Sequence, residues 1–425
     1  MEIKIEKLVF GGQGLGRHEG KVVFVWGVLP GETVLVRLLR NKKDYAEGVV
    51  EQVIKPAPQR IAPLEDHYLS CSPWQVLTPA AEAEWKLQLG RDAYYSWREH
   101  YDLSKLTLVN DLARQIGYRN KIEYSLWQTD DKLDLAFFGR GSHSRQAISP
   151  CVLADANINT TAQGVLAWLR SESITGFHLK SLIILSNERG QTSAGLFLKD
   201  KISVKTYPKL TAGLQGFQLY YSNPKCPAAV PTELLYQDGI IDITSTVLGT
   251  PLRHSPLGFF QVNIPMFEQA VRTIGEWLDP ASPLIDYYSG VGSISLPLIQ
   301  KCSGVLLVEN NQSAIAMAET NIQTLGVPDR CQTKCIAAEA MLDCITSEHI
   351  VIIDPPRAGL HNDVVQRLLA VQPKRIIYLS CNLSTQARDV EKLLAKYTIK
   401  QAKLFNFFPR TPHIEGLCVL NRNTS

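Results

Sequence analysis

The sequence predicts an α/β protein of three domains: a small N-terminal β-barrel, an α+β central domain and a C-terminal domain built on a parallel sheet. Three observations support this organisation. The 425 residues exceed what one ordinary domain holds. A content of 45% hydrophobic and 20% charged residues is typical of soluble globular proteins. The spacing of apolar runs changes twice along the chain, so we expect domains at 1–57, 66–252 and 253–425.

The composition limits the possible partners and compartments. A formal net charge of +3 permits a nucleic-acid partner without requiring one. No apolar run reaches the about 18 residues that a membrane-spanning helix needs, and the charged start does not resemble a signal peptide. Nine scattered cysteines without a CxxC pair favour reduced thiols over a disulfide framework. We therefore expect a cytoplasmic protein without a membrane partner.

Residues 1–57 alternate apolar and polar positions in short runs that glycine and proline turns separate. This pattern predicts a closed barrel with strands near 21–26, 33–38 and 48–54. Four basic residues gather beside Tyr45 in an expected loop: Arg37, Arg40, Lys42 and Lys43. Cations next to an aromatic ring suit contact with RNA, although a solvated loop on a structural barrel explains them equally well.

The central stretch, 66–252, has a mixed pattern. A helix is expected over 79–100, followed by strands near 121–127, 182–185, 193–198 and 217–221. Two short segments place cations near a ring or a glycine turn, 118–121 and 139–140. They could line an RNA groove, but ordinary surface solvation is the commoner explanation.

The C-terminal stretch alternates apolar strands with helices. The expected strands are 284–287, 304–308, 349–353, 375–379 and 416–421, and one expected helix is 313–325. Buried strands separated by helices predict a parallel sheet covered on both faces. Ligands of such sheets bind at the carboxyl ends of the strands, so the residues after each strand matter most.

A glycine turn follows the first strand of this sheet. Asp286 begins the sequence DYYSGVGS, and Glu309 lies seventeen residues after Gly292, at the end of the next strand. An acid in that position can accept hydrogen bonds from both ribose hydroxyls. A nicotinamide site would typically have glycine where Ser295 stands. The pattern instead resembles Rossmann-like S-adenosylmethionine-dependent methyltransferases, although a simple packing turn would explain the glycines alone.

Asp354-Pro355-Pro356-Arg357 follows another strand. Because each proline restricts the backbone, this turn can hold the Asp354 carboxylate rigidly against a flat base. Nucleobase nitrogen methyltransferases use a related turn that is usually followed by an aromatic ring. Arg357 in that position weakens the interpretation as a nitrogen methyltransferase.

A cysteine, Cys381, follows the strand at 375–379. A thiolate that adds to carbon 6 of uracil makes carbon 5 nucleophilic enough to accept a methyl group. The proton on carbon 5 must then leave, which requires a general base. His413 and Glu415, directly before the last strand, are both candidates. Taken alone, Cys381 could also be an inert core thiol.

Together these motifs resemble the RNA 5-methyluridine methyltransferases, and more closely the branch with an N-terminal TRAM domain that includes bacterial 23S rRNA enzymes. The most specific segments are FFQVN at 259–263, DPPR at 354–357, SCN at 380–382 and HIE at 413–415. The resemblance implies a class I S-adenosyl-L-methionine-dependent methyltransferase domain behind an OB-like barrel. It assigns Cys381 as nucleophile and Glu415 as base. The implied cofactor-binding residues are Gln261, Tyr288, Gly290, Gly292, Ser293, Glu309 and Asp354.

One departure from the family concerns a four-iron cluster, which many members hold with four cysteines. The corresponding regions, 66–75 and residue 151, supply only Cys71 and Cys151. Two thiols cannot complete the usual set. We therefore expect no iron-sulfur cluster and no metal, with His67 and Trp74 helping to pack this region. His67 as a replacement ligand and a bridge between the two cysteines remain alternatives.

The sequence thus predicts methylation of carbon 5 of a uridine in structured RNA, with the barrel and central domain binding the RNA. The TRAM-like barrel favours 23S rRNA over tRNA as the substrate. Methylation of a nucleobase nitrogen, or RNA binding without catalysis, are the alternatives. Nothing in the pattern indicates a dimer interface, so we expect a monomer.

Overall fold

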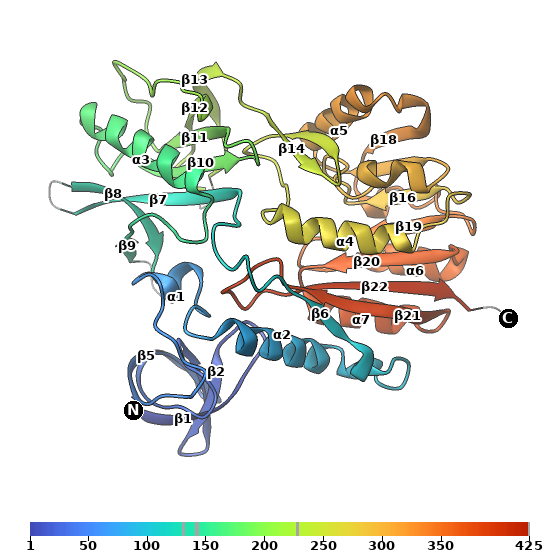
Figure 1. The fold of residues 1–425 in the computed structure, drawn as a ribbon, viewed down its shortest axis with the longest axis horizontal. Coiled ribbons are helices and arrows are strands. Elements are labelled where there is room, and N and C mark those ends of the chain that lie inside the picture. Colours follow the sequence, from blue (N-terminus) through green and yellow to red (C-terminus); the bar gives the residue numbers. More distant parts are fainter. Residues whose placement is uncertain (130–131, 141–143, 227–228, 424–425) are drawn as a thin grey trace.

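The computed structural model describes residues 1–129, 132–140, 144–226 and 229–423. It consists of a closed barrel, a seven-stranded sheet and an eight-stranded sheet with helices on its faces (Figure 1). The barrel lies at one end below the seven-stranded sheet, and the eight-stranded sheet lies beside both. No helix in the described ranges combines the length and the apolar character needed to cross a membrane.

The N-terminal barrel closes in the strand order β1-β2-β3-β5-β4, as the sequence predicts. Its strands are β1 (Glu2–Leu8), β2 (Gly14–His18), β3 (Lys21–Trp26), β4 (Thr33–Asn41) and β5 (Tyr45–Lys55). Alternate residues point inward and form a small core that includes Ile5, Val25 and Val34. The basic residues at 37–43 are exposed where β4 passes into β5.

After the barrel, α1 (Tyr68–Cys71) contacts β8 (Lys132–Phe138) of the central sheet. The segment that follows α1 packs on the C-terminal sheet, although it belongs to the range 66–252 expected to form the central domain. Its elements are α2 (Pro79–Ala93), the short 3-10 helices Tyr95–Trp97 and Leu103–Lys105, and β6 (Thr107–Val109). Thr78 caps α2 by accepting a hydrogen bond from the Ala81 backbone, and Pro79 occupies the first turn. Strand β6 pairs in parallel with the last-but-one strand of the C-terminal sheet.

The central sheet has the strand order β13-β12-β11-β10-β7-β8-β9. Its strands are β7 (Lys121–Thr129), β8 (Lys132–Phe138), β9 (Arg145–Ala147), β10 (Leu179–Ser186), β11 (Thr192–Leu198), β12 (Leu214–Tyr221) and β13 (Glu233–Gly239). Helix α3 (Ala156–Ser171) packs its apolar residues on this sheet and forms one core with it. A two-stranded ribbon, β14 (Ile243–Val247) and β15 (Thr250–His254), then leads to the C-terminal domain.

The C-terminal sheet has the order β18-β17-β16-β19-β20-β22-β21-β6. Its strands are β16 (Leu284–Tyr287), β17 (Val305–Glu309), β18 (Cys331–Cys335), β19 (Ile350–Ile353), β20 (Arg375–Ser380), β21 (Tyr397–Phe405) and β22 (Glu415–Arg422). The helices are α4 (Ile264–Glu276), α5 (Gln312–Leu325), α6 (Asn362–Val371) and α7 (Leu383–Leu393), with 3-10 helices at Leu296–Lys301, Pro328–Arg330 and Ala338–Ala340.

The prediction of a fully parallel sheet is wrong for its last part. Strand β22 runs antiparallel to both β20 and β21. A buried strand shows the same continuous apolar run in either direction, so the residue pattern could not reveal this reversal. The reversal matters because it brings the start of β22, rather than its end, to the carboxyl end of β20.

Candidate active site

The strand register brings the motif residues to one edge of the C-terminal sheet. Tyr287 pairs with Val308 on one side and with Ile353 on the other. Consequently Tyr288, Glu309 and Asp354, each one residue further along, follow at the same level. Ser380 pairs with Gly416, so Cys381 and Glu415 lie next to each other at this edge.

The Cys381 thiol is only partly buried, so it is not sealed in the interior. Burial raises its pKa to about 11, and the carboxylates of Glu415 and Asp354 act in the same direction, whereas Arg357 acts against them. The following Asn382 caps α7 and donates a hydrogen bond from Nδ2 to the Arg357 carbonyl over 2.9 Å. This hydrogen bond joins the residues around Cys381 to the DPPR turn at 354–357.

Glu415 and His413 differ in their surroundings. The Glu415 side chain is buried, and burial together with Asp354 raises its pKa well above the ordinary value, while Arg357 acts in the opposite direction. A carboxylate of this kind binds a proton strongly. His413 keeps part of its surface in contact with solvent, but the atoms packed around its ring and the nearby cations, Arg357 first among them, lower its pKa to about 4. Of the two candidates, only Glu415 is aligned with Cys381 by strand pairing.

The glycine turn is tied to Glu309. Gly290 and Asn311 donate backbone hydrogen bonds to its two carboxylate oxygens over 3.1 and 2.8 Å. Gly292 has φ +84°, and a Cβ there would lie 2.6 Å from Leu296, so both its conformation and its packing require glycine. A 3-10 helix, Leu296–Lys301, follows the turn.

Several buried polar groups around this turn have no hydrogen-bond partner among the described residues. They are both carboxylate oxygens of Asp286 and the hydroxyls of Ser289 and Ser295, although Ser295 lies near enough to Asp286 to interact weakly with its carboxylate. Burial raises the pKa of Asp286 to about 7, although the hydroxyl and backbone nitrogen of Ser295 act in the opposite direction. Burial and the neighbouring Asp286 charge together raise the pKa of Asp354 to about 7. Buried polar atoms are rarely left unpaired without reason.

Asp286 is therefore a candidate site residue that the sequence analysis did not select. Its position at the start of the DYYSGVGS turn was the available signal. The orphaned groups at this edge suit a cationic ligand with several donors, and S-adenosyl-L-methionine carries a sulfonium, an ammonium group and ribose hydroxyls. The residues present thus fit that cofactor.

The FFQVN segment lies where the central and C-terminal domains meet. Asn120 holds it by hydrogen bonds to the carbonyls of Gln261 and Val262 over 3.1 and 3.0 Å. Asn263 caps α4 and donates to the Phe407 carbonyl over 2.9 Å. The Gln261 side chain is buried, and its role in cofactor binding stays a prediction.

A buried ionic cluster, which the sequence did not indicate, holds the loop that carries His413 and Glu415. Lys86 Nζ lies 3.0 Å from Glu82 Oε1 and donates to Asn406 Oδ1 over 2.6 Å. The Arg410 guanidinium donates to the Gln75 carbonyl over 2.8 Å, and its Nη1 lies 3.3 Å from Glu82. We call Glu82, Lys86, Asn406 and Arg410 the loop clamp.

Two family models match this chain. The model described as tRNA (Uracil-5-)-methyltransferase matches residues 256–423, and the TRAM domain model matches residues 1–50. Over these two regions the chain is similar to RNA (uracil-5-)-methyltransferases that carry a TRAM domain. This confirms the predicted family, enzyme class and S-adenosyl-L-methionine cofactor.

Relatives of this RNA methyltransferase extend over nearly its whole length. The 23S rRNA (uracil(1939)-C(5))-methyltransferase RlmD of Dichelobacter nodosus is 27% identical over 99% of this chain and 98% of its own. An uncharacterized RNA methyltransferase of Thermosynechococcus vestitus is 28% identical over 99% and 97%. The solved tRNA (uracil-54, C5)-methyltransferase of Pyrococcus abyssi, in complex with S-adenosyl-L-homocysteine, has a TM-score of 0.80, 23% identity, and coverage of 99% of this chain and 100% of that chain. The shared architecture confirms the predicted fold class.

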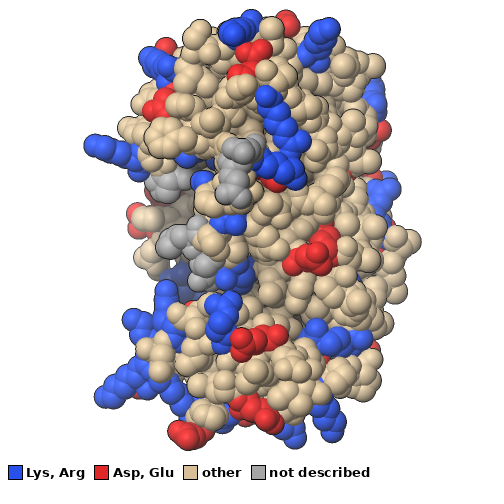
Figure 2. All heavy atoms as spheres, turned by 90° about the vertical axis from the view of Figure 1, so that its left-hand side faces the viewer, with Lys and Arg blue, Asp and Glu red and all other residues tan. Residues whose placement is uncertain are grey.

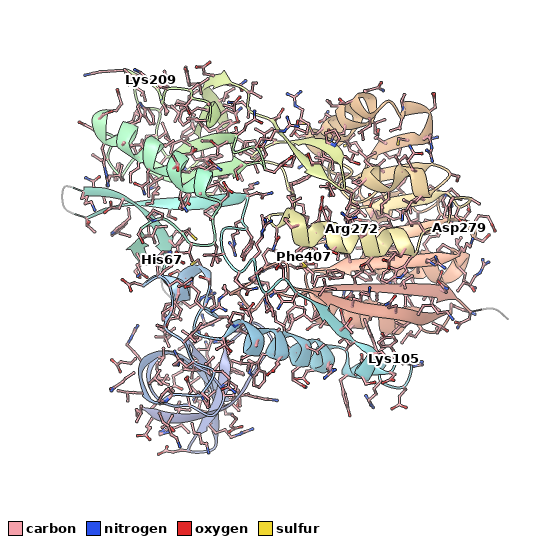
Figure 3. The ribbon with its side chains drawn as sticks, in the orientation of Figure 1. His67, Lys105, Lys209, Arg272, Asp279 and Phe407 are labelled. Carbon is pink, nitrogen blue, oxygen red and sulfur yellow. The ribbon has the colours of Figure 1, made fainter. Side chains whose placement is uncertain are left out.

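The region of the family's four-iron cluster is differently built in this methyltransferase. Trp74 is buried, and its indole nitrogen donates to the Gly12 carbonyl of the barrel over 3.1 Å, which agrees with the predicted packing role. His67 lies between the barrel and the central sheet (Figure 3). Cys71 and Cys151 are neighbours, but the other ligand-type groups beside them belong to Glu65 and His67. These residues do not fit a cluster that needs four cysteines.

The cationic segments of the central domain fasten the methyltransferase's domains together. The Tyr118 hydroxyl donates to the Pro409 carbonyl over 3.0 Å, and Lys121 Nζ donates to the Gly258 carbonyl over 2.7 Å. Arg140 lies 4.3 Å above the Trp26 ring of the barrel. The sequence analysis offered two interpretations of these residues, an RNA groove and a solvated surface. Neither interpretation includes these contacts between domains of the same chain.

Proposed function

We propose that this methyltransferase acts on carbon 5 of a uridine through a covalent adduct between Cys381 Sγ and carbon 6. The observation that carries the proposal is the partly exposed Cys381 beside the buried Glu415 at the carboxyl edge of the sheet. A structural thiol would require neither this exposure nor an adjacent buried carboxylate.

The proposed chemistry uses both residues. The Cys381 thiolate adds to carbon 6, and the electron pair of the 5,6 double bond moves towards the carbonyl at position 4 to form an enolate. Carbon 5 then takes the methyl group, with S-adenosyl-L-homocysteine as the leaving group. Glu415 removes the proton from carbon 5, the double bond returns, and the Cys381 thiolate leaves carbon 6.

In the free protein both groups favour their protonated forms, because burial raises the pKa values of Cys381 and Glu415. S-adenosyl-L-methionine supplies the methyl group and a positive charge when bound. A cation close to these residues lowers their pKa values and so favours the thiolate and the carboxylate. We therefore propose that the active protonation state forms in the complex.

The cofactor site is proposed to comprise the residues around the glycine turn. Glu309 has acceptor capacity left for ribose hydroxyls, since a carboxylate has about four lone-pair sites and two are used by Gly290 and Asn311. Asp286 and Asp354 would face the positive groups. The full proposed set is Gln261, Asp286, Tyr288, Gly290, Gly292, Ser293, Glu309 and Asp354.

We propose that the substrate is structured RNA, with 23S rRNA favoured over tRNA. Support comes from the TRAM match and from the curated relatives named as 23S rRNA enzymes. Lysines and arginines gather over the lower part of one face, where the barrel lies (Figure 2). The target uridine must leave its stack, because a thiolate has to approach carbon 6 from above the ring.

The decisive experiment uses RNA that contains 5-fluorouridine at the target position. Because fluorine cannot leave as a proton does, the protein should form an RNA adduct that survives denaturation, and Cys381→Ala should form none. Mass spectrometry of nucleosides from 23S rRNA and tRNA, with and without the gene, would identify the substrate. Absence of an adduct, or loss of a nitrogen-methylated base instead of 5-methyluridine, would contradict the proposal.

A further inference from the structure

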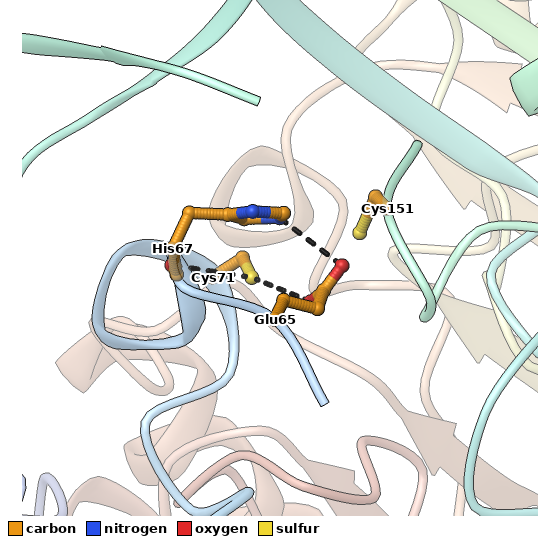
Figure 4. A group of neighbouring side chains, drawn as sticks. All are labelled: Glu65, His67, Cys71 and Cys151. Carbon is orange, nitrogen blue, oxygen red and sulfur yellow. Dashed lines mark hydrogen bonds and ion pairs between the residues drawn. The ribbon is translucent and has the colours of Figure 1, made fainter. Parts of the chain in front are cut away.

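Four side chains from two distant segments meet between the barrel and the central sheet. Glu65, His67 and Cys71 lie in and before α1, and Cys151 follows β9 (Figure 4). One ligand-type atom from each lies within 4.8 Å of the others. Three of the four residues are buried and Cys71 is partly buried, so the group is largely screened from water.

The contacts within this group leave the His67 Nε2 nitrogen poorly satisfied, whereas Cys71 Sγ lies 3.0 Å from Ser72 Oγ and 3.8 Å from the His67 carbonyl. His67 Nε2 lies 3.1 Å from Glu65 Oε2, yet forms no hydrogen bond of acceptable geometry with any described residue. The imidazole is only 3% exposed, so bulk water has little access to this nitrogen as a hydrogen-bond partner. Cys71 Sγ lies 3.7 Å from Glu65 Oε1. The His67 nitrogen thus lies beside one carboxylate and two thiols, which are all groups that bind a cation.

We propose that Glu65, His67, Cys71 and Cys151 bind one zinc ion. Two sulfurs, one imidazole nitrogen and one carboxylate oxygen form a ligand set that zinc accepts in tetrahedral geometry, whereas magnesium and calcium prefer oxygen alone. Zinc bond lengths to sulfur, nitrogen and oxygen place tetrahedral ligand atoms about 3.3–3.8 Å apart. Ligand atoms already within 4.8 Å of one another need only small side-chain adjustments to reach this spacing.

The geometry argues against a four-iron cluster in the same place. Each ligand of such a cluster binds a different iron, so the four ligand atoms must surround a cube and lie farther apart than the ligands of one ion. The usual set is also four thiolates, and only Cys71 and Cys151 are present. The protein supplies all four ligands of the proposed site, which is typical of structural rather than catalytic zinc.

Hydrogen bonds with neighbouring residues hold two of the proposed ligand residues in place. Glu65 accepts hydrogen bonds from the Val152 backbone over 2.7 Å and from Gln75 Nε2 over 2.9 Å. Asn159 accepts from the Cys151 backbone nitrogen over 3.1 Å and donates to its carbonyl over 2.9 Å. Partners of this kind orient metal ligands and raise affinity. The site is therefore supported from both segments.

The position of the site suggests its role. Residues 65–71 follow the barrel, whereas Cys151 belongs to the central domain. Nearby, Arg140 of the central domain donates to the Leu69 carbonyl and covers the Trp26 ring of the barrel. An ion bound here would fix the barrel relative to the central sheet, which are the two parts proposed to hold RNA.

The metal content of the full-length protein tests the proposal. The protein is produced in cells supplied with zinc, purified under reducing conditions and analysed by inductively coupled plasma mass spectrometry. We expect about one zinc per chain. Cys71→Ser and Cys151→Ser should lose the metal, whereas Cys226→Ser and Cys335→Ser, outside the group, should retain it. Replacement by Co²⁺ should produce the absorption of a tetrahedral site with two thiolates.

Thermal unfolding provides a second readout that does not depend on the variants. Removing zinc from the wild-type protein with a chelator should lower Tm by about 5 °C or more, and zinc alone should restore it. The proposal is overturned by reduced wild-type protein that neither contains nor takes up zinc. Iron accompanied by inorganic sulfide, or a Cys71–Cys151 disulfide under the same reducing conditions, would also overturn it.

Discussion

Two regions of this methyltransferase bury carboxyl groups, and they do so in opposite ways. In the loop clamp, Glu82 lies against Lys86 and Arg410 and accepts hydrogen bonds from the Arg410 backbone over 3.0 Å. At the carboxyl edge of the sheet, Asp286 has no cationic partner among the described residues, and burial outweighs its weak interaction with Ser295. A paired buried charge stabilises a loop, whereas an unpaired one is costly and indicates a ligand.

This difference predicts that changes at the sheet edge remove activity and spare stability, and that changes in the clamp do the reverse. The largest effect is expected for Cys381→Ala. Without the thiolate, carbon 5 is not nucleophilic, so methyl transfer should fall by at least about 10,000-fold. Activity and Tm are measured together, with Cys335→Ala as the control. Methyl transfer by Cys381→Ala at a rate close to that of the wild type would contradict the catalytic role assigned to the sheet edge.

Glu415→Gln should separate methyl transfer from release. A single methyl group should be transferred, but loss of the base should slow turnover by about 100- to 10,000-fold. The RNA adduct should then accumulate and be visible by denaturing gel electrophoresis. The exposed Glu391→Gln is a matched control. Normal turnover in Glu415→Gln would move the role of base to another group, with His413 the first candidate.

Lys86→Met tests the clamp. The change removes a buried cation that contacts Glu82, Asn406 and the Phe408 carbonyl, so the free energy of unfolding should fall by about 3–5 kcal/mol. Denaturant titration measures this loss, with the exposed Lys392→Met as control. Activity at low temperature should decline much less than in Cys381→Ala. An unchanged stability would show that the clamp does not hold the loop.

Asp286→Asn should give the smallest but most specific effect. Its pKa of about 7 in the folded protein exceeds the ordinary value of 3.8, so the folded state keeps a proton that the unfolded state loses. The stability from this group is therefore present below about pH 4 and is lost as pH rises through about 7. Asp286→Asn should flatten this decline in denaturant titrations of the free protein.

The same variant should weaken S-adenosyl-L-methionine binding about 10- to 100-fold in calorimetry, because a charged hydrogen-bond partner is lost. Asp363→Asn, on the exposed face of α6, is the control for both measurements. A variant that binds the cofactor normally would show that the orphaned carboxylate at Asp286 has another purpose.

The local elements followed closely from the residue pattern. The expected strands at 21–26 and 284–287 have the same limits as β3 and β16. The residues after each strand identified the edge where Glu309, Asp354 and Cys381 lie. These signals are local, because the alternation of apolar residues depends on burial of one segment at a time.

Other features depend on which segments meet. Glu82 and Arg410 lie 328 residues apart in the sequence. Glu65 lies 87 residues before Val152, and its carboxylate accepts a hydrogen bond from the Val152 backbone nitrogen. Counting cysteines at 66–75 and 151 indicated two ligands, with His67 as an alternative third, whereas Glu65 carries no sequence signal until the chain folds. Likewise, an apolar run does not record strand direction, and the reversal of β22 decides that Glu415 faces Cys381.

The sequence by itself therefore determined the kinds of chemistry available: a thiol, several acids, a glycine turn and a barrel, each within a short segment. The tertiary structure decided which of these groups are paired and which are left for a ligand. The physical reason is that the cost of a buried charge depends on neighbours brought from distant parts of the chain. The burial of Asp286 without a cationic partner among the described residues, and the gathering of Glu65, His67, Cys71 and Cys151, arise only from that folding.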